Sequence, residues 1–321
     1  MGLGLLLLAT DASAQIACGD VLGPGGSFVA DADIGPCVEL PALRIVGPVK
    51  VDFAGHAVSC NADTAVGIEI TGKGAKVSNG SVSGCHTGVE ISGDGKHKLE
   101  EMMAELNQAL GFEVNSAGNK LTHNTAFQNG FGGGPGDGFI VRGAKNTLTE
   151  NWGVDNTDEG FEVDGTKVKM TGNVAVNNTG EGVRIDAGSG KYKKNLLSSN
   201  ITGFRVGGTG CAFTSNVTIA HGTFEGFFIT AGDGKYSKNV AVGNADAGMD
   251  FTGGGDDNKV TKTFAAGNVN FGFEVEGQGN SLKSNVAIGN GDTDLVDLNG
   301  NCTDNTWSKN LFSTASPICI E

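Results

Sequence analysis

Residues 146–163 of this 321-residue chain read NTLTENWGVDNTDEGFEV, and they contain every element of a repeat that recurs along the sequence. Counterparts of the closing GFEV are GIEI (67–70), GVEI (88–91), GFEV (111–114), GFIV (138–141), GVRI (182–185), GFRV (203–206), GFFI (226–229), GMDF (248–251), GFEV (272–275) and, in degenerate form, LVDL (295–298). The step is 21–24 residues in nearly every case. A fixed period of this length indicates a repeat architecture.

Each repeat has the pattern of three short strands. GFEV alternates apolar and polar residues, as a half-buried strand does. A second strand is of the Lys-Leu-Thr type (120–122), and a third is of the Val-Ala-Val type (174–176). Two columns of Asn lie between them, where stacked side chains can hydrogen-bond along the stack. The columns are Asn124, Asn151, Asn173, Asn195, Asn216, Asn239, Asn285 and Asn129, Asn156, Asn178, Asn200, Asn244, Asn290. We therefore predict an all-β fold, a single parallel β-helix of about eleven coils.

For residues 97–110, helix propensity and the repeat pattern predict different structures. HKLEEMMAELNQAL has strong helix formers at helical spacing. The same segment aligns with the 146–163 repeat without a gap, and a helix of this length would rise about 20 Å. A rise of that size does not fit one coil, so we predict a strand-containing coil here.

The runs NKLTHNTA, NTLTEN and GFEV resemble the right-handed parallel β-helix family of secreted bacterial proteins, the pectin-lyase-like superfamily. The resemblance covers residues 43–312 and implies a right-handed solenoid. The superfamily includes lyases, hydrolases, epimerases, adhesins and passive surface proteins, so the fold implies little about activity.

The ends of the chain depart from the repeat. Residues 1–14 have an apolar run and a small-residue cleavage pattern, which predict the remnant of a secretory signal. Residues 15–42 are expected to form an N-terminal cap, 43–312 the β-helix, and 313–321 a C-terminal cap or tail. A cap is needed because an end coil would expose its apolar interior and unpaired strand groups. The protein is therefore expected to be secreted, periplasmic or on the cell surface.

Seven Cys in an exported chain predict disulfides. Cys18–Cys37, Cys60–Cys85 and Cys302–Cys319 are close in sequence or one coil apart, and each pair is near an end of the solenoid. Cys211 is then left as a buried free thiol.

Composition excludes several function classes. A net charge of −14 argues against a nucleic-acid partner, and beyond the signal no segment is long and apolar enough to span a membrane. Five scattered His argue against a zinc or copper site. His56 with Asp52 is interpreted as a turn histidine with a structural carboxylate. The Gly-rich insertion 130–137 is a long loop of the kind that often carries function. It shows no obvious chemistry beyond Asp137, so a tolerated insertion is at least as well supported.

Function is expected at the outward positions of the sheet. The x position of Gly-Phe-x-Val is mostly acidic: Glu69, Glu90, Glu113, Ile140, Glu162, Arg184, Arg205, Phe228, Asp250, Glu274 and Asp297. On a different face, the Lys-Leu-Thr strands form a basic column: Lys98, Lys120, Lys169, Lys191, Lys235 and Lys259. Charge is thus segregated around the circumference.

A mid-sheet cluster offers the best chemical constellation: Arg142, Glu162, Asp164, Arg184, Asp186 and Arg205. The resemblance to acidic-polysaccharide lyases implies that Asp164 and Asp186 hold Ca²⁺ and, with Arg142, bind substrate. It makes Arg184, Glu162 and Arg205 the catalytic candidates. Carboxylates on neighbouring coils also leave open a glycosidase, which needs them about 5–9 Å apart. The competing interpretation is structural, because alternating Glu and Arg avoids stacking like charges.

Three functions remain open. The first is an exported protein that binds carbohydrate or a cell-envelope polymer on its acidic sheet without catalysis. The second is a polysaccharide lyase or hydrolase at the mid-sheet cluster, with or without Ca²⁺. The third is a structural or adhesive surface rod.

Overall fold

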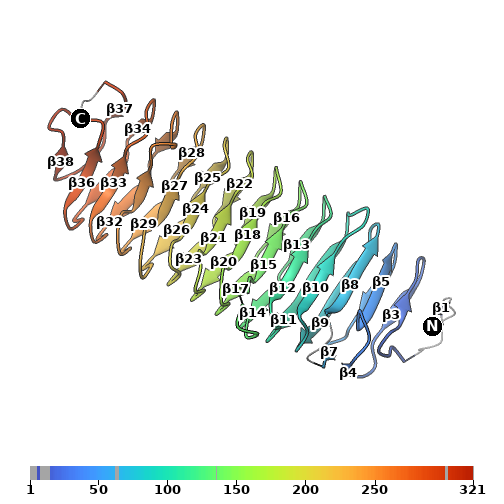
Figure 1. Cartoon of the computed structure of the whole chain (residues 1–321). Helices are drawn as coiled ribbons and strands as arrows, with labels where there is room; N and C mark the ends of the chain where they lie inside the picture. Colours follow the sequence, from blue (N-terminus) through green and yellow to red (C-terminus); the bar gives the residue numbers. More distant parts are fainter. Residues whose placement is uncertain (1–5, 8–14, 62–64, 135, 301–302, 321) are drawn as a thin grey trace. The chain divides into compact units, whose positions relative to one another are not determined.

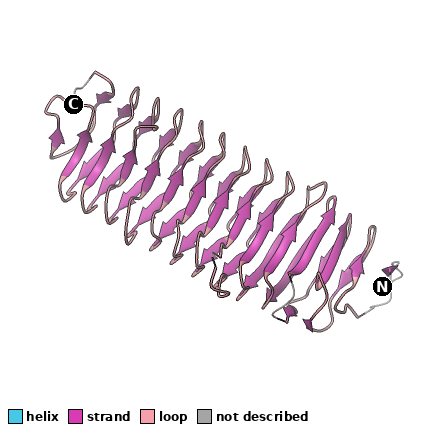
Figure 2. Cartoon of the chain, in the orientation of Figure 1, coloured by secondary structure: helices cyan, strands magenta, loops and turns pink. Residues whose placement is uncertain are grey.

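The computed structural model describes residues 6–7, 15–61, 65–134, 136–300 and 303–320. This described part consists of strands and turns and contains no helix (Figure 2). It forms a parallel β-solenoid of about 13 turns, slightly more than the eleven predicted. The chain comprises two compact units, a first unit of residues 1–165 and a second unit of residues 166–321. The predicted signal, residues 1–14, lies outside the described residues except for 6–7.

The GFEV-type strands of each unit stack in parallel to form sheet A (Figure 1). In the first unit they are β1 (Leu6–Leu7), β2 (Val21–Leu22), β5 (Leu43–Gly47), β8 (Val66–Gly72), β10 (Thr87–Ile91), β12 (Leu110–Val114), β15 (Phe139–Val141) and β18 (Phe161–Val163). In the second unit they are β21 (Val183–Ile185), β24 (Phe204–Val206), β27 (Phe227–Ile229), β30 (Met249–Phe251), β33 (Phe271–Val275), β36 (Thr293–Asp297) and β38 (Ala315–Ser316).

The other strands form sheet B, in which Lys-Leu-Thr and Val-Ala-Val strands alternate along the chain. In the first unit they are β3 (Ser27–Val29), β4 (Ile34–Cys37), β6 (Lys50–Asp52), β7 (Ala57–Cys60), β9 (Lys76–Ser83), β11 (Lys98–Glu105), β13 (Lys120–Thr122), β14 (Thr125–Phe127), β16 (Thr147–Thr149) and β17 (Trp152–Val154). In the second they are β19 (Lys169–Thr171), β20 (Val174–Val176), β22 (Lys191–Lys193), β23 (Leu196–Ser198), β25 (Ala212–Thr214), β26 (Val217–Ile219), β28 (Lys235–Ser237), β29 (Val240–Val242), β31 (Lys259–Thr261), β32 (Phe264–Ala266), β34 (Ser281–Lys283), β35 (Val286–Ile288) and β37 (Thr306–Ser308).

Two segments need separate description: the residues before 43, which add to the number of turns, and residues 97–110, which have helix propensity. β2, β3 and β4 pair in parallel with β5, β6 and β7, so this part of the chain before residue 43 adds strands to the stack. β11 confirms the prediction of a strand-containing coil, since it pairs with β9 on one side and with β13 and β14 on the other. Pairing on both edges overrides the helix propensity of its residues.

The interior of each unit is filled by stacked inward side chains. In the first unit, Phe139 stacks between Phe112 and Phe161 with ring centroids 4.7 and 4.8 Å away. In the second, Phe213 stacks between Tyr192 and Tyr236 at 4.9 and 4.8 Å. Offset stacks of this kind add about 0.5–1.5 kcal/mol to the burial of each pair. The strand spacing thus sets the spacing of the core.

Both predicted Asn columns are confirmed, and the structure reveals a third. Asn124 donates to Asn151 in the first column and Asn129 to Asn156 in the second, both over 2.9 Å. The third column precedes the Lys-Leu-Thr strands and was not predicted; its members are His97, Asn119, Asn146, Asn258, Asn280 and Asn305. These buried amides satisfy backbone N–H groups at corners where sheet bonding stops.

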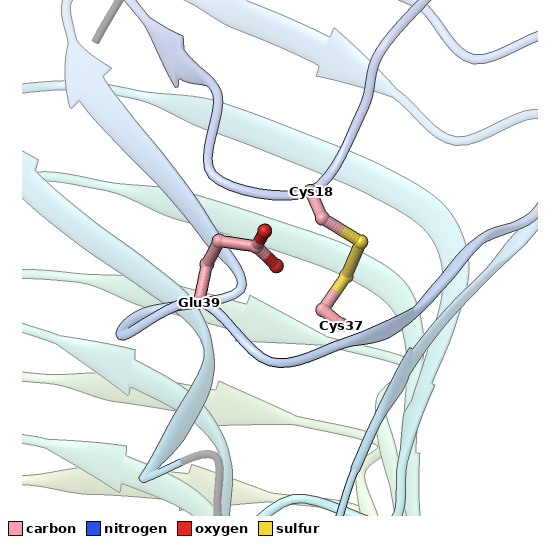
Figure 3. A group of neighbouring side chains, drawn as sticks. All are labelled: Cys18, Cys37 and Glu39. Atoms are coloured by element: carbon pink, nitrogen blue, oxygen red, sulfur yellow. A yellow bond between two sulfur atoms is a disulfide. The ribbon is translucent and has the colours of Figure 1, made fainter. Parts of the chain in front are cut away.

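Disulfides Cys18–Cys37 and Cys60–Cys85 are confirmed. Figure 3 shows the first, with the carboxylate of Glu39 beside it. Its sulfurs are bonded to each other, so this group does not have the thiolates that a metal site needs. Cys319 is also disulfide-bonded, but its predicted partner Cys302 lies outside the described residues. Cys211 is a buried free thiol, as predicted, and burial raises its pKa.

The last repeat was aligned one residue out of register. Leu295 pairs with Phe273 and Val296 with Glu274, so the outward acidic position ends in Val296 and not in Asp297. Asp297 points inward, is 3% exposed and accepts a 3.0 Å hydrogen bond from Trp307 Nε1. The prediction for Asp297 was wrong because its carboxylate serves the C-terminal coil as a buried acceptor.

Candidate functional site

The outward face of sheet A in the first unit has a row of three stacked carboxylates. Glu69, Glu90 and Glu113 are in register on β8, β10 and β12. Arg44 holds Glu69 over 2.6 Å, and Arg142 pairs with Glu113. Burial raises the pKa of Glu90, and its two glutamate neighbours raise it further. Like charges therefore do stack here, and Arg residues stabilise the two ends of the row.

The mid-sheet cluster is divided between the two units. In the first, Arg142 Nε lies 4.0 Å from an Asp164 oxygen, and Glu162 is in register with Ile140. Arg142 is thus engaged by two carboxylates, Glu113 and Asp164. Asp164 belongs to the first unit and Asp186 to the second. That these two carboxylates bind one Ca²⁺ ion together therefore stays a prediction.

In the second unit, Arg184 and Arg205 are neighbours in register on β21 and β24. Arg184 Nε donates to Asp186 over 2.9 Å, and Arg205 Nη1 lies 3.6 Å from Glu181. Two guanidinium groups thus lie side by side on strands about 4.8 Å apart. Arg184 and Arg205 are thus each paired with a carboxylate of their own unit.

Next to this Arg pair, the x position continues with Phe228, Asp250 and Glu274 on β27, β30 and β33. We call the five residues Arg184, Arg205, Phe228, Asp250 and Glu274 the second-unit row. Burial raises the pKa of Asp250 to about 8, and Glu274 and other carboxylates add to the shift. Burial also raises the pKa of Glu274 to about 7, with Asp246 and Glu276 contributing. At neutral pH one of these carboxyls holds a proton and can donate a hydrogen bond.

Glu225 and Asp246 lie in the turns that precede the row. Glu225 is 8% exposed, and burial raises the pKa of its carboxyl. Asp246 accepts a 2.7 Å hydrogen bond from Asn270. These acids add to the effect of burial, which is the main cause of the raised pKa of Asp250.

Other residues singled out in the sequence have structural roles. His56 Nδ1 lies 3.3 Å from Asp33, not Asp52. Asp52 accepts hydrogen bonds from Ala54 N and Asn79, and these bonds lower its pKa. This supports the interpretation of a turn histidine with a structural carboxylate.

Asp137, at the end of the Gly-rich insertion, lies close to two other acidic residues, Asp158 and Glu159. Asp137 Oδ1 accepts a 3.0 Å bond from Glu159 N, and oxygens of Asp137, Asp158 and Glu159 lie within 4.8 Å of one another. Such a group has the hard oxygen ligands that Ca²⁺ prefers. Asp137 is the one residue of the insertion for which the sequence suggested chemistry, and in the structure its carboxylate accepts a backbone hydrogen bond.

Among the hollows of the described residues, one lies off the rows and another adjoins the carboxylate row of the first unit. One of about 330 Å³ in the second unit is lined by Asp233, Lys235, Asp257 and Lys259. The other, of about 220 Å³ in the first unit, has an apolar wall of Leu40 and Pro41 beside the charged groups of Arg44, Glu69 and Glu90.

Comparison with known proteins agrees with this geometry. Residues 66–216 match the family described as right handed beta helix region. The match covers just under half of the chain, and the fold of the described residues, a parallel β-solenoid, agrees with it. Comparison with curated protein sequences gives no significant match.

Solved structures similar to this β-helix protein include polysaccharide-modifying enzymes. A mutant of the periplasmic alginate epimerase AlgG has a TM-score of 0.66 at 14% identity, with 90% of this chain and 78% of that chain covered. A mannuronic acid specific polysaccharide family 6 lyase from human gut microbiota has a TM-score of 0.64 at 10% identity, with 95% and 84% covered. An alginate lyase from Paenibacillus sp. str. FPU-7 has a TM-score of 0.51 at 14% identity, with 71% and 86% covered. At these identities the likeness shows the fold alone.

Within this β-helix protein, the carboxyls whose pKa values are raised most lie outside the cluster predicted from the sequence. The cluster centred on Arg184 was chosen for its mixture of charges. These two carboxyls, Asp250 and Glu274, lie three and four coils later. The x positions of the sequence did contain a sign of this group. Two acids, Asp250 and Glu274, follow each other there, next to the uncharged Phe228.

Proposed function

We propose that this protein is exported and binds an acidic carbohydrate, or another cell-envelope polymer with similar groups, along the outward face of sheet A without cleaving it. The observation that carries this proposal is the second-unit row, which places two guanidinium groups, one aromatic ring and two carboxyls on five successive strands. The two disulfides support export, since such bonds persist in oxidising compartments.

Each group in the row matches a part of a uronic-acid polymer. Guanidinium groups bind carboxylates by charge-assisted hydrogen bonds, which suits Arg184 and Arg205. The ring of Phe228 is partly exposed and offers an apolar face to a sugar ring. Asp250, protonated, donates to a hydroxyl, whereas Glu274 accepts from one. The similar solved structures named above include an alginate epimerase and a mannuronic acid specific lyase, which supports a uronate as the ligand.

Binding is tested by calorimetric titration of oligouronates into the full chain. We expect saturable binding that Phe228→Ala and Arg205→Ala each weaken by about tenfold, equivalent to about 1.4 kcal/mol. Phe131→Ala is the matched control, because Phe131 is an exposed ring (57%) in a loop of the first unit. No binding of acidic or neutral oligosaccharides by the wild type would favour the structural rod instead.

The predicted role of Ca²⁺ is tested in the same experiment. If Asp164 and Asp186 hold the ion, Ca²⁺ should bind the wild type saturably and should not bind Asp186→Asn. Binding that is equal in both proteins would remove these residues from the proposal without affecting the row.

The second candidate function is cleavage, and the raised pKa values of Asp250 and Glu274 favour it. A protonated carboxyl beside an ionisable one, on strands about 4.8 Å apart, is an arrangement used for general acid and base catalysis. Incubation with polyuronates, followed by ultraviolet detection of unsaturated products and by a reducing-end assay, separates lyase from hydrolase activity. Product formation that Asp250→Asn abolishes would replace binding by catalysis as the function.

A further inference from the structure

A strip of apolar side chains faces outward on the Val-Ala-Val strands of the second unit. The middle residue of each strand is buried, and the two flanking residues point out. We call these outward residues the apolar strip: Val174, Val176, Leu196, Ser198, Val217, Ile219, Val240, Val242, Phe264, Ala266, Val286 and Ile288. Leu196, Ile219 and Ile288 are 38–40% exposed. Eleven of the twelve are apolar. The outward residues of this face are therefore of the types that usually form a protein core.

Charge around the apolar strip is of one sign. The strip and the adjoining Lys-Leu-Thr strands lie in segments 169–178, 191–200, 212–221, 235–244, 259–268 and 281–290. These sixty residues contain nine Lys and no Asp or Glu, in a chain with a net charge of −14. Lys194, Lys238 and Lys262 form one border of the strip, at corner positions with positive φ. The opposite border, at residues 177, 199, 220, 243, 267 and 289, has no charged residue.

We propose that the apolar strip docks on an anionic phospholipid surface. Aliphatic side chains gain free energy by leaving water for the boundary between headgroups and acyl chains. Lysines beside them are attracted to anionic headgroups, and their long stems let the ammonium reach the phosphates. The absence of carboxylates removes the repulsion that the rest of this acidic chain would meet at such a surface.

The size and chemistry of the strip argue against other occupants. Six strands about 4.8 Å apart, each with two outward residues, present only about 250 Å². A stable protein interface buries about 800 Å² per partner, so a second copy would be held weakly by this strip alone. A sugar polymer is a poor match, because Ser198 is the only residue of the strip whose side chain can hydrogen-bond to sugar hydroxyls.

The proposal is tested by co-sedimentation of the full chain with vesicles of equimolar phosphatidylcholine and phosphatidylglycerol, and with phosphatidylcholine alone. We expect binding to the anionic vesicles that weakens with salt. The double variant Ile219→Glu/Ile288→Glu should lower it by about tenfold or more, since carboxylates would then face the lipid. Trp152→Glu, at an outward position of strand β17 in the first unit and 50% exposed, is the control and should not change binding.

A second variant does not disturb the strip itself. Lys194→Gln/Lys238→Gln/Lys262→Gln should weaken binding to anionic vesicles by about fivefold for each Lys removed. Lys50→Gln/Lys98→Gln/Lys120→Gln removes the same charge from the first unit and should have little effect. Circular dichroism confirms that each variant is folded.

Three results would overturn the proposal. One is a wild type that does not bind anionic vesicles. Another is binding that both strip variants leave unchanged. The third is a concentration-dependent dimer in sedimentation velocity that the double Glu variant abolishes, without vesicle binding, which would assign the strip to a second copy.

Discussion

In the first unit, the Val-Ala-Val strand positions and their corners contain carboxylates, among them Glu101, Glu105, Glu150 and Asp155, whereas the same positions in the second unit contain none. The first unit has nine Lys and Arg against 21 Asp and Glu, a formal charge of −12; the second has 13 against 15, a charge of −2. Both units nevertheless have the same coil, the same register and the same kind of interior. The comparison shows that stacking constrains the inward and corner positions, while outward positions vary freely and can become specialised.

The largest expected effect tests whether the two interiors are equivalent. Phe139→Ala in the first unit and Phe213→Ala in the second each remove a fully buried ring from the centre of a stack. We expect each to lower the free energy of unfolding by about 3–5 kcal/mol, measured by urea denaturation. Phe131→Ala, at an exposed ring, is the control. A loss below about 1 kcal/mol in one unit only would show that the interiors differ.

The next largest effect is the pH dependence of stability that the raised pKa of Asp250 causes, which we compare below with that of Glu90 in the first unit. The pKa of Asp250 is raised to about 8, against about 3.9 in an unfolded chain. The folded state therefore holds a proton that the unfolded state releases, and this contribution to stability is lost as pH rises from about 4 to about 8.

Asp250→Asn cannot ionise, so it should be more stable than the wild type by about 1–3 kcal/mol at pH 8.5 and similar to it at pH 4. Thermal unfolding across this pH range provides the measurement. Glu90→Gln, in the three-carboxylate row of the first unit, should show the same sign with a smaller size. A difference that does not depend on pH would contradict the assigned cause.

A smaller effect concerns the one described break in the second Asn column. His221 occupies a position that is Asn129 in the first unit, and its Nε2 is buried without a hydrogen-bond partner. Burial lowers its pKa to about 4, so stability present above about pH 6.5 is lost as pH falls through 4. His221→Asn should restore the column, add about 1–2 kcal/mol at pH 5 and flatten the acid limb of the stability curve. Loss of stability would show that the imidazole fills space that an amide leaves empty.

The smallest effect concerns the exposed ion pairs. The side chain of Arg184 is 34% exposed beside Asp186, and that of Arg142 is 44% exposed beside Glu113. Arg184→Ala and Arg142→Ala should each change the free energy of unfolding by about 0–1 kcal/mol. A loss above about 2 kcal/mol in either variant would mean that the pair is part of a larger network and not a local surface contact.

Much of the fold could be predicted because its determinants repeat. Every coil needs the same local features, and these can be recognised in the sequence. They are the alternation in GFEV, the Asn at corners and the constant coil length, which residues 97–110 match without a gap. The third Asn column was missed because it has few members. Glycine, valine and cysteine stand in for Asn at residues 168, 190, 211 and 234, and a pattern interrupted four times in succession does not stand out by period alone.

The candidate site was predicted less well than the coil. Arg184 and Arg205 were recognised as outward and neighbouring, and their register is confirmed. The ionisation of Asp250 could not be foreseen, since it depends on burial and on carboxylates that come from two other coils. Asp297 was assigned to the wrong face because a one-residue change of register reverses every side chain of a strand.

By itself the sequence determined the period, the inward residues and the pairs of Cys near the N-terminus, because each depends on residues within one coil or on its nearest neighbour. Only the tertiary structure decided which outward residues become neighbours and how strongly their charges interact. Parallel stacking brings residues more than twenty positions apart to within one strand spacing, where burial and shared charge set the pKa values. The same stacking converts scattered Val, Leu and Ile of six repeats into one continuous surface, a property that no single repeat possesses.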